Sequence, residues 1–116
     1  MFRNERTSPA DISRLARQLV ELPATTRRLY PRSREQGLDP AALQVLICLW
    51  LEDGQSVGEL AEKLELRSQS TSNALRSLQA AKLVRERPDP TDGRRRLQWL
   101  TASGRRRAEK FIISRA

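Results

Sequence analysis

Six residues in the second half of the sequence require the chain to reverse. They read Pro-Asp-Pro-Thr-Asp-Gly over residues 88–93, and proline, aspartate and glycine are the residues that tight turns favour. Residues 82–87 before them are typical of a helix end that passes into a strand, and residues 94–100 return as a second strand. The sequence therefore predicts a two-stranded hairpin. The tip of this hairpin carries three consecutive arginines: Arg94, Arg95 and Arg96.

Two short helices are predicted immediately before the hairpin. The first begins with a capping box at Ser56, whose hydroxyl is placed to accept a hydrogen bond from the N–H of Glu59. The apolar residues of its inner face are Leu60, Ala61 and Leu64. After a turn of about three residues, Ser68 is expected to cap a second helix that continues to about Ala81. Two short helices joined by so short a turn are typical of a helix-turn-helix unit.

The second of these helices has two different faces. At about 100° per residue, its apolar arc consists of Thr71, Ala74, Leu75 and Leu78. The opposite side carries Gln69, Asn73 and Arg76, flanked by Ser72 and Ser77, with Ser68 at the start. Glutamine and asparagine can hydrogen-bond adenine through two atoms, and arginine can do the same with guanine. Since solvated helix faces usually mix Glu with Lys, this face predicts contacts with base edges; a merely polar surface is the alternative.

The N-terminal region predicts a further helix. Ser8 is expected to cap it, with Pro9 at the first helical position and Asp11 in the first turn. Its apolar residues follow heptad-like spacing: Ile12, Leu15, Leu19, Leu22 and Leu29, with Thr26 in the gap. Pro23 removes one backbone donor and predicts a kink or break near residues 19–23. The apolar face either packs on the core of the same chain or forms a dimer contact, and so short a chain favours a subunit contact.

A buried helix is predicted in the middle of the sequence. Gly37 ends the preceding region, and Asp39 followed by Pro40 is a typical helix start. Residues 41–51 are almost wholly apolar, which indicates burial on most sides. Cys48 lies within this run, without the electropositive and exposed setting that a redox-sensing thiol requires. We therefore expect a structural role for Cys48.

A last helix is predicted after Thr101, which is expected to cap it. Its apolar stripe consists of Ala108, Phe111 and Ile112. Residues 105–107 are three arginines near the start of this helix, where the helix dipole disfavours positive charge. Such a placement indicates either an outside partner or a solvated cluster.

The positive charge of the chain is concentrated in its second half. Residues 1–66 hold nine Arg/Lys and ten Asp/Glu, a net charge of −1, whereas residues 67–116 hold thirteen and four, a net charge of +9. Such asymmetry indicates a polyanionic partner. Nucleic acid is the leading candidate, because each cation placed against a phosphate backbone releases counterions. A membrane surface, or a basic face without a partner, is the alternative.

Several classes of protein are disfavoured by the composition. The chain has one cysteine and no histidine, so it can form neither an internal disulfide, nor a Cys/His zinc site, nor a Ser-His-Asp triad. We expect no enzyme, no metal and no cofactor. No apolar stretch approaches the roughly 20 residues that span a bilayer, and the N-terminus lacks the apolar run of a secretory signal. We therefore expect a soluble, cytoplasmic protein that does not contact membranes.

The segment from about Leu38 to Gly104 resembles the MarR family of bacterial winged-helix transcriptional regulators. The matching segments are Leu38-Asp39-Pro40, Val57-Gly58-Glu59-Leu60-Ala61, Leu78 with Leu83-Val84, Asp89-Pro90-Thr91-Asp92-Gly93-Arg94, and Leu100-Thr101-Ala102-Ser103-Gly104. The family wing carries Asp-x-Arg, here residues 92–94, and its second strand closes with Leu-Thr-x-x-Gly. Two features depart from the family pattern: Lys82 stands where the family usually has glycine, and only twelve residues follow Gly104, where the family normally adds longer dimerisation helices.

The resemblance implies a mode of DNA binding. The helix from Ser68 to Ala81 would enter the major groove, while Arg94, braced by Asp92, would reach the flanking minor groove. A narrow minor groove concentrates negative potential and attracts arginine. Members of the family usually repress promoters as homodimers. Many release DNA on binding a small phenolic or lipophilic molecule, and some on thiol oxidation.

The expected fold is mostly α with a small β-hairpin, a winged helix-turn-helix flanked by N- and C-terminal helices. Its expected divisions are residues 1–36, a helical region that could serve dimerisation; residues 37–104, the DNA-binding domain; and residues 105–116, a short basic helix. The expected function is sequence-specific recognition of double-stranded DNA by a repressor, with helix 68–81 in the major groove and wing 85–100 in the minor groove. Its expected partners are DNA, a second copy bound through the N-terminal helix and, in addition, a small-molecule effector. The alternative is a protein-interaction or assembly module on the same scaffold.

Overall fold

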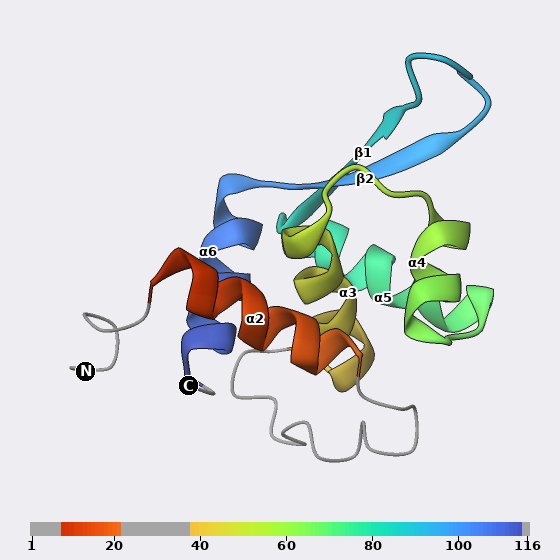
Figure 1. Cartoon of the computed structure of the whole chain (residues 1–116). Helices are drawn as coiled ribbons and strands as arrows, with labels where there is room; N and C mark the ends of the chain where they lie inside the picture. Colours follow the sequence, from red (N-terminus) through yellow and green to blue (C-terminus); the bar gives the residue numbers. More distant parts are fainter. Residues whose placement is uncertain (1–7, 22–37, 115–116) are drawn as a thin grey trace.

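The computed structural model describes residues 8–21 and 38–114. Within them the chain forms five helices and one antiparallel hairpin, which confirms the expected fold class. The elements in order are α2 (Pro9–Val20), α3 (Pro40–Leu51), α4 (Val57–Leu64), α5 (Ser68–Ala80), β1 (Val84–Pro88), β2 (Arg96–Leu100) and α6 (Ala102–Ile113). The helices gather into one body, from which the hairpin projects beside α4 (Figure 1).

Helix α3 is the centre of this body. Its residues 42–49 are all buried, as the apolar run predicts, and α3 contacts α2, α5 and α6 as well as α4 and β2. Helices α2 and α6 lie on one side of α3, and α4 and α5 on the other (Figure 1). Cys48 is buried in this helix, and burial raises the pKa of its thiol. The thiol therefore stays protonated near neutral pH, which agrees with a structural role.

Side-chain caps start most of the helices where the sequence predicts them. Ser8 accepts from the N–H of Asp11, Asp39 from that of Ala42, and Ser56 from that of Glu59, with a complete capping box in α2 and α4. The expected cap at Ser68 is wrong. Arg67 occupies the N-cap position without a side-chain hydrogen bond, and Ser68 is the first helical residue of α5. The turn before α5 is as short as expected because Glu65 ends α4 in the left-handed conformation.

The apolar face of α2 packs on the core of its own chain. Ala16 is fully buried, while Ile12, Leu15 and Leu19 are partly buried against the same core. The helix ends at Val20, within the interval where a break is expected. The remaining residues of the expected seam and its breaker (Leu22, Pro23, Thr26 and Leu29), together with Gly37, lie outside the described residues.

The segment Leu-Thr-x-x-Gly fastens the base of the hairpin to α6. The hydroxyl of Thr101 accepts a hydrogen bond from the N–H of Gly104 and donates one to the carbonyl of Lys82. The backbone N–H of Thr101 donates to the carbonyl of Leu83. Lys82 has a φ of 62°, the left-handed conformation that glycine adopts most readily. This conformation explains why glycine suits the position, and it shows that the lysine adopts the same turn.

The second strand of the hairpin is shorter than expected. β2 begins at Arg96, so Arg94 and Arg95 belong to the turn. β1 pairs with β2 from Val84 opposite Leu100 to Pro88 opposite Arg96. The turn is longer because the N–H of Asp89 donates to Arg95 and the N–H of Arg95 donates to Asp92, which closes the chain within the tip itself.

In the described part of the chain, no helix has the length and apolar character needed to cross a membrane. Residues 8–21 and 38–114 also contain no group of three metal-binding side chains.

Candidate nucleic-acid interface

The outer face of α5 is built as the sequence predicts. Its apolar arc is buried, and most of its polar residues are exposed. The buried residues are Thr71, Ala74, Leu75 and Leu78; the exposed ones are Ser68, Gln69, Asn73, Arg76 and Ser77, with Ser72 half-buried. The helix contains no acidic residue. This arrangement leaves a row of hydrogen-bonding side chains without a negative charge that would repel phosphate.

Asn73 organises this row. Its Oδ1 accepts a hydrogen bond from Gln69 Nε2 at 3.1 Å and another from Arg76 Nη1 at 3.3 Å. All three side chains are exposed, so water or a base edge can replace these bonds at little cost. The row therefore offers both donors and acceptors, which is the combination that reading a base edge requires.

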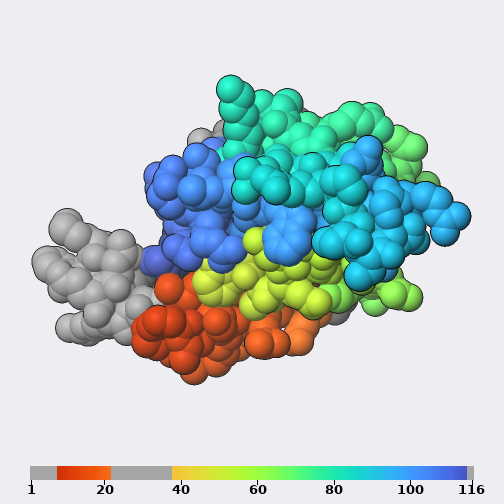
Figure 2. Space-filling model, turned by 90° about the horizontal axis from the view of Figure 1, so that it is seen from above, coloured from red at the N-terminus to blue at the C-terminus, as the bar shows by residue number. Residues whose placement is uncertain are grey.

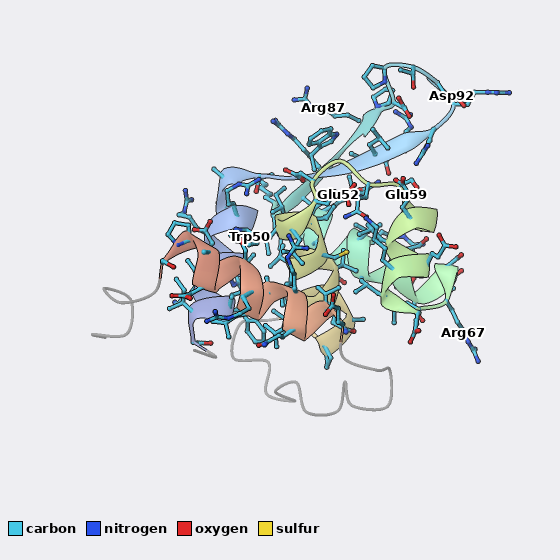
Figure 3. The ribbon with its side chains drawn as sticks, in the orientation of Figure 1. Trp50, Glu52, Glu59, Arg67, Arg87 and Asp92 are labelled. Carbon is cyan, nitrogen blue, oxygen red and sulfur yellow. The ribbon has the colours of Figure 1, made fainter. Side chains whose placement is uncertain are left out.

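The tip of the hairpin holds Arg94 outward. Asp92 Oδ1 accepts from the backbone N–H of Arg94 at 3.1 Å and from its Nε at 3.3 Å. The Arg94 side chain is nevertheless 94% exposed. Asp92 lies at the far end of the hairpin (Figure 3). Asp89 fixes a second turn within the tip, because its carboxylate accepts hydrogen bonds from both the N–H and the hydroxyl of Thr91 at 2.8 Å. The loop that carries Arg94 is therefore held by its own hydrogen bonds.

The other two arginines of the tip point elsewhere. Arg95 Nη2 lies 2.8 Å from Glu59 Oε1 and donates to Ser56 Oγ at 3.4 Å, so this side chain clamps the wing to the start of α4. Arg96 Nε lies 3.8 Å from Glu86 Oε2 on the neighbouring strand. The sequence groups three arginines at the tip, whereas the structure turns only Arg94 fully to solvent. DNA contact by Arg95 and Arg96 stays a prediction.

Acidification is expected to weaken the clamp between the wing and α4. The Ser56 N–H and the Arg95 guanidinium hold the pKa of Glu59 below its ordinary value of 4.5. A lowered pKa contributes stability above the unfolded value, and this stability is lost as the pH falls through the folded pKa. The free energy of unfolding should therefore fall more steeply below pH 4.5 in the wild type than in Glu59→Gln. The glutamine retains an acceptor for Ser56 but carries no charge, and parallel pH profiles in chemical denaturation would rule out the ion pair.

Gln98 joins the wing to α5, a role that was not predicted from the sequence. This residue of β2 is fully buried. Its Oε1 accepts from Gln79 Nε2 of α5 at 2.9 Å, and its Nε2 donates to Glu86 Oε1 of β1 at 2.9 Å. Its backbone forms an isolated bridge with Gln55 in the turn between α3 and α4. Strand alternation could have predicted that Gln98 is buried, because residues two apart in a strand share a face and Leu100 is apolar.

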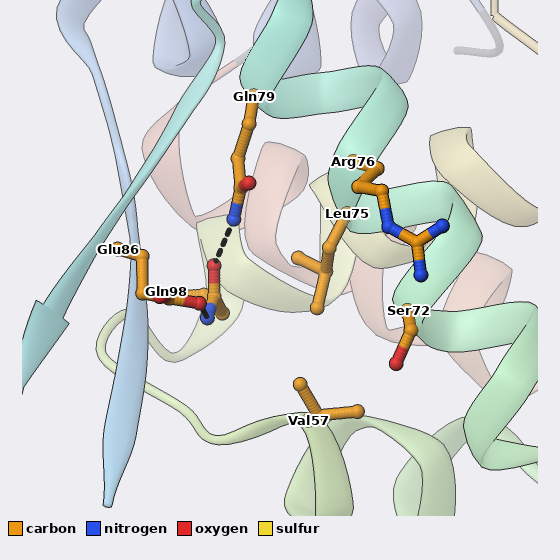
Figure 4. A pocket seen from close by; sticks show the side chains of 7 residues that line it. All are labelled: Val57, Ser72, Leu75, Arg76, Gln79, Glu86 and Gln98. Carbon is orange, nitrogen blue, oxygen red and sulfur yellow. Dashed lines mark hydrogen bonds between the residues drawn. The ribbon is translucent and has the colours of Figure 1, made fainter.

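A pocket of about 250 Å³ opens between α5 and the wing (Figure 4). It is lined by Val57, Ser72, Leu75, Arg76, Gln79, Glu86 and Gln98. Gln79 and Gln98 are joined by a hydrogen bond at one side of it, while Arg76 and Ser72 lie at the other side (Figure 4). The α5 face and the wing therefore border one concave surface.

Comparisons with known proteins agree with this geometry. A family model described as the MarR family matches residues 36–95. A search of the curated proteins finds no match. Among solved structures, a mutant of ZitR from Lactococcus lactis is 24% identical with a TM-score of 0.63, and the match covers 68% of this chain and 53% of ZitR. This chain therefore spans about half the length of that relative.

Two structures of MepR from S. aureus are also similar. A mutant from a multidrug-resistant clinical isolate is 26% identical with a TM-score of 0.64, and the match covers 75% of this chain and 67% of that one. A MepR–DNA complex is 24% identical with a TM-score of 0.61, and the match covers 91% and 78%. Because the family model covers more than half of its residues, the chain belongs to the MarR family.

Proposed function

We propose that this chain is a sequence-specific regulator of transcription that binds double-stranded DNA. The observation that carries this proposal is the pairing of two features on one surface: the acid-free polar row of α5 and the fully exposed Arg94 on the wing. The major groove admits an α-helix, and its base edges match the side chains of the row. The MepR–DNA complex supports DNA as the class of partner.

Each part of the surface has a separate task in this proposal. Asn73, Arg76 and Gln69 read base edges in the major groove, while the neighbouring serines contact phosphate oxygens. Arg94 enters the adjacent minor groove, where narrow A·T-rich DNA attracts guanidinium groups. The hydrogen bond from Arg94 Nε to Asp92 holds the arginine side chain in its outward position. Binding accounts for these residues without any catalytic step.

Repression, homodimerisation and control by an effector belong to the same proposal. A domain bound across a promoter excludes other proteins from that DNA, which is sufficient for repression. Residues 1–36 are proposed to join two copies, because two-fold symmetry would place two α5 helices on a palindromic site. A small molecule that favours another arrangement of the two copies would then release the DNA.

Variants of the two features test the proposal separately. Asn73→Ala and Arg76→Ala should each weaken binding to the preferred duplex by about 1–3 kcal/mol and relax its specificity. Arg94→Ala should make the negative slope of log K against log salt shallower by about 0.9, the value for one phosphate contact. Fluorescence anisotropy with labelled duplexes measures both effects.

Lys63→Ala provides the matched control, because Lys63 is an exposed cation that already pairs with Glu52 and belongs neither to the proposed DNA-reading residues nor to residues 1–36. It should leave affinity and specificity unchanged. Wild-type binding by all three variants of α5 and the wing would refute the proposed interface. A stable protein complex on a sizing column, without salt-sensitive duplex binding, would instead favour a protein-interaction module.

A further inference from the structure

A second basic surface lies where α6 meets the end of α5. A pocket of about 320 Å³ is lined by Ala81, Leu83, Ser103, Arg106, Arg107 and Lys110. Three of these six residues are cationic, and none is acidic. We call this surface the α6 basic pocket.

Two cations of this pocket have no carboxylate to neutralise them among the described residues. Arg105, which precedes Arg106 in the sequence, forms an ion pair with Asp53 at 3.1 Å. Within residues 8–21 and 38–114, by contrast, Arg106 and Lys110 form no ion pair, and Arg106 donates only to the hydroxyl of Ser103 at 3.2 Å. Both side chains are exposed, and nearby helix charges of like sign repel one another.

The start of α6 also supplies no negative charge to offset these cations. Its first turn contains no acidic residue, and Arg106 lies just beyond that turn. Lys110 lies in the last turn of α6. An anion in the pocket would relieve the repulsion between the two side chains.

The pocket borders the proposed DNA-reading face. Ala81 caps the C-terminal end of α5 and also lines the pocket. In Figure 2 the atoms of α5 and α6 meet at one edge of the molecule, whereas α2 occupies the opposite edge. A helix of 13 residues is roughly 20 Å long, which exceeds the roughly 12 Å width of the major groove. If α5 lies across the major groove, its far end therefore comes close to the backbone that borders the groove.

We propose that Arg106 and Lys110 bind DNA phosphates at the end of α5 that lies away from the wing tip. This inference rests on the proposed function and extends it, since each subunit would grip the backbone at both ends of its recognition helix. The guanidinium of Arg106 suits two phosphate oxygens at once, whereas Lys110 supplies a point charge.

The test is the salt dependence of binding to a mixed-sequence duplex, measured with the full chain between about 50 and 200 mM salt. Arg106→Ala/Lys110→Ala should make the negative slope of log K against log salt shallower by about 1.8, corresponding to two phosphate contacts. Lys63→Ala/Arg105→Ala removes the same charge at two exposed cations that already pair with Glu52 and Asp53, and it should leave the slope close to the wild-type value. Arg106→Lys/Lys110→Arg keeps both charges and should retain the wild-type slope.

The outcomes separate this inference from the proposed function. If Arg94→Ala makes the slope shallower but Arg106→Ala/Lys110→Ala does not, the pocket does not contact DNA and the proposed function stands. Equal losses in the Lys63/Arg105 and Arg106/Lys110 double variants would show an effect of net charge alone and would overturn the inference. If the wild type binds no duplex, both proposals fail. Circular dichroism of each variant excludes loss of folding as the cause.

Discussion

Gly104→Ala is expected to lower the free energy of unfolding by about 1–3 kcal/mol, although alanine is the better helix former. A Cβ at this position would lie 2.0 Å from the carbonyl oxygen of Leu83 and 2.9 Å from its carbon. These are backbone atoms, so rotation of a side chain cannot relieve the overlap. Either α6 or the entry to β1 must shift, and that shift disturbs the junction that holds the base of the wing.

Gly58→Ala is the matched control for this prediction. Gly58 also lies in the first turn of a helix, α4, but a Cβ added there would have Ser56 Oγ, at 3.9 Å, as its nearest neighbour. The same exchange should therefore stabilise the protein by up to about 1 kcal/mol through helix propensity alone. Chemical denaturation of the two variants measures the difference. Stabilisation by Gly104→Ala would contradict the close approach of α6 to Leu83.

Gln98→Met is expected to destabilise the protein by about 1–3 kcal/mol and to loosen the wing. Methionine has a similar length and shape, so packing is largely kept while both side-chain hydrogen bonds are lost. Gln79 then loses its acceptor on β2, and Glu86 loses its donor. Because these bonds tie the wing to α5, hydroxyl-radical footprints should lose protection in the minor groove before major-groove contacts weaken.

Glu86→Gln separates the hydrogen bond from the charge. A glutamine at position 86 still presents a carbonyl oxygen to Gln98 Nε2, so stability should stay within about 0.5 kcal/mol of the wild type. The account of Gln98 as the link would be wrong if Gln98→Met matched the wild type in both stability and footprint. It would also be wrong if Glu86→Gln alone removed the minor-groove protection.

Local sequence patterns predicted most of the helical framework. The capping residues of α2, α3 and α4 act on the N–H groups three residues ahead, so their signals lie within one turn of helix. The buried and exposed faces of α5 follow in the same way from a fixed rotation per residue. Leu78 and Asn73 could therefore be assigned to opposite faces from the sequence alone.

Features set by distant contacts were harder to predict. The direction of Arg95 depends on Glu59, 36 positions earlier, which approaches only once the wing folds against α4. Gln98 meets Gln55 and Gln79 from separate elements. Strand alternation could indicate that Gln98 is buried, but nothing in the local sequence indicates these partners. The start of α5 was misplaced by one residue because Ser68 is a good capping residue by type, whereas the geometry of the preceding turn gives that position to Arg67.

Selection of bound sequences from a random duplex pool tests the central claim most directly. If α5 and the wing read DNA, the wild type should enrich one motif, and the proposed dimer should enrich it as a palindrome with half-sites about one helical turn apart. Asn73→Ala and Arg76→Ala should then relax the selection at individual positions of that motif. A bound pool with no sequence enriched over the starting mixture would contradict the account.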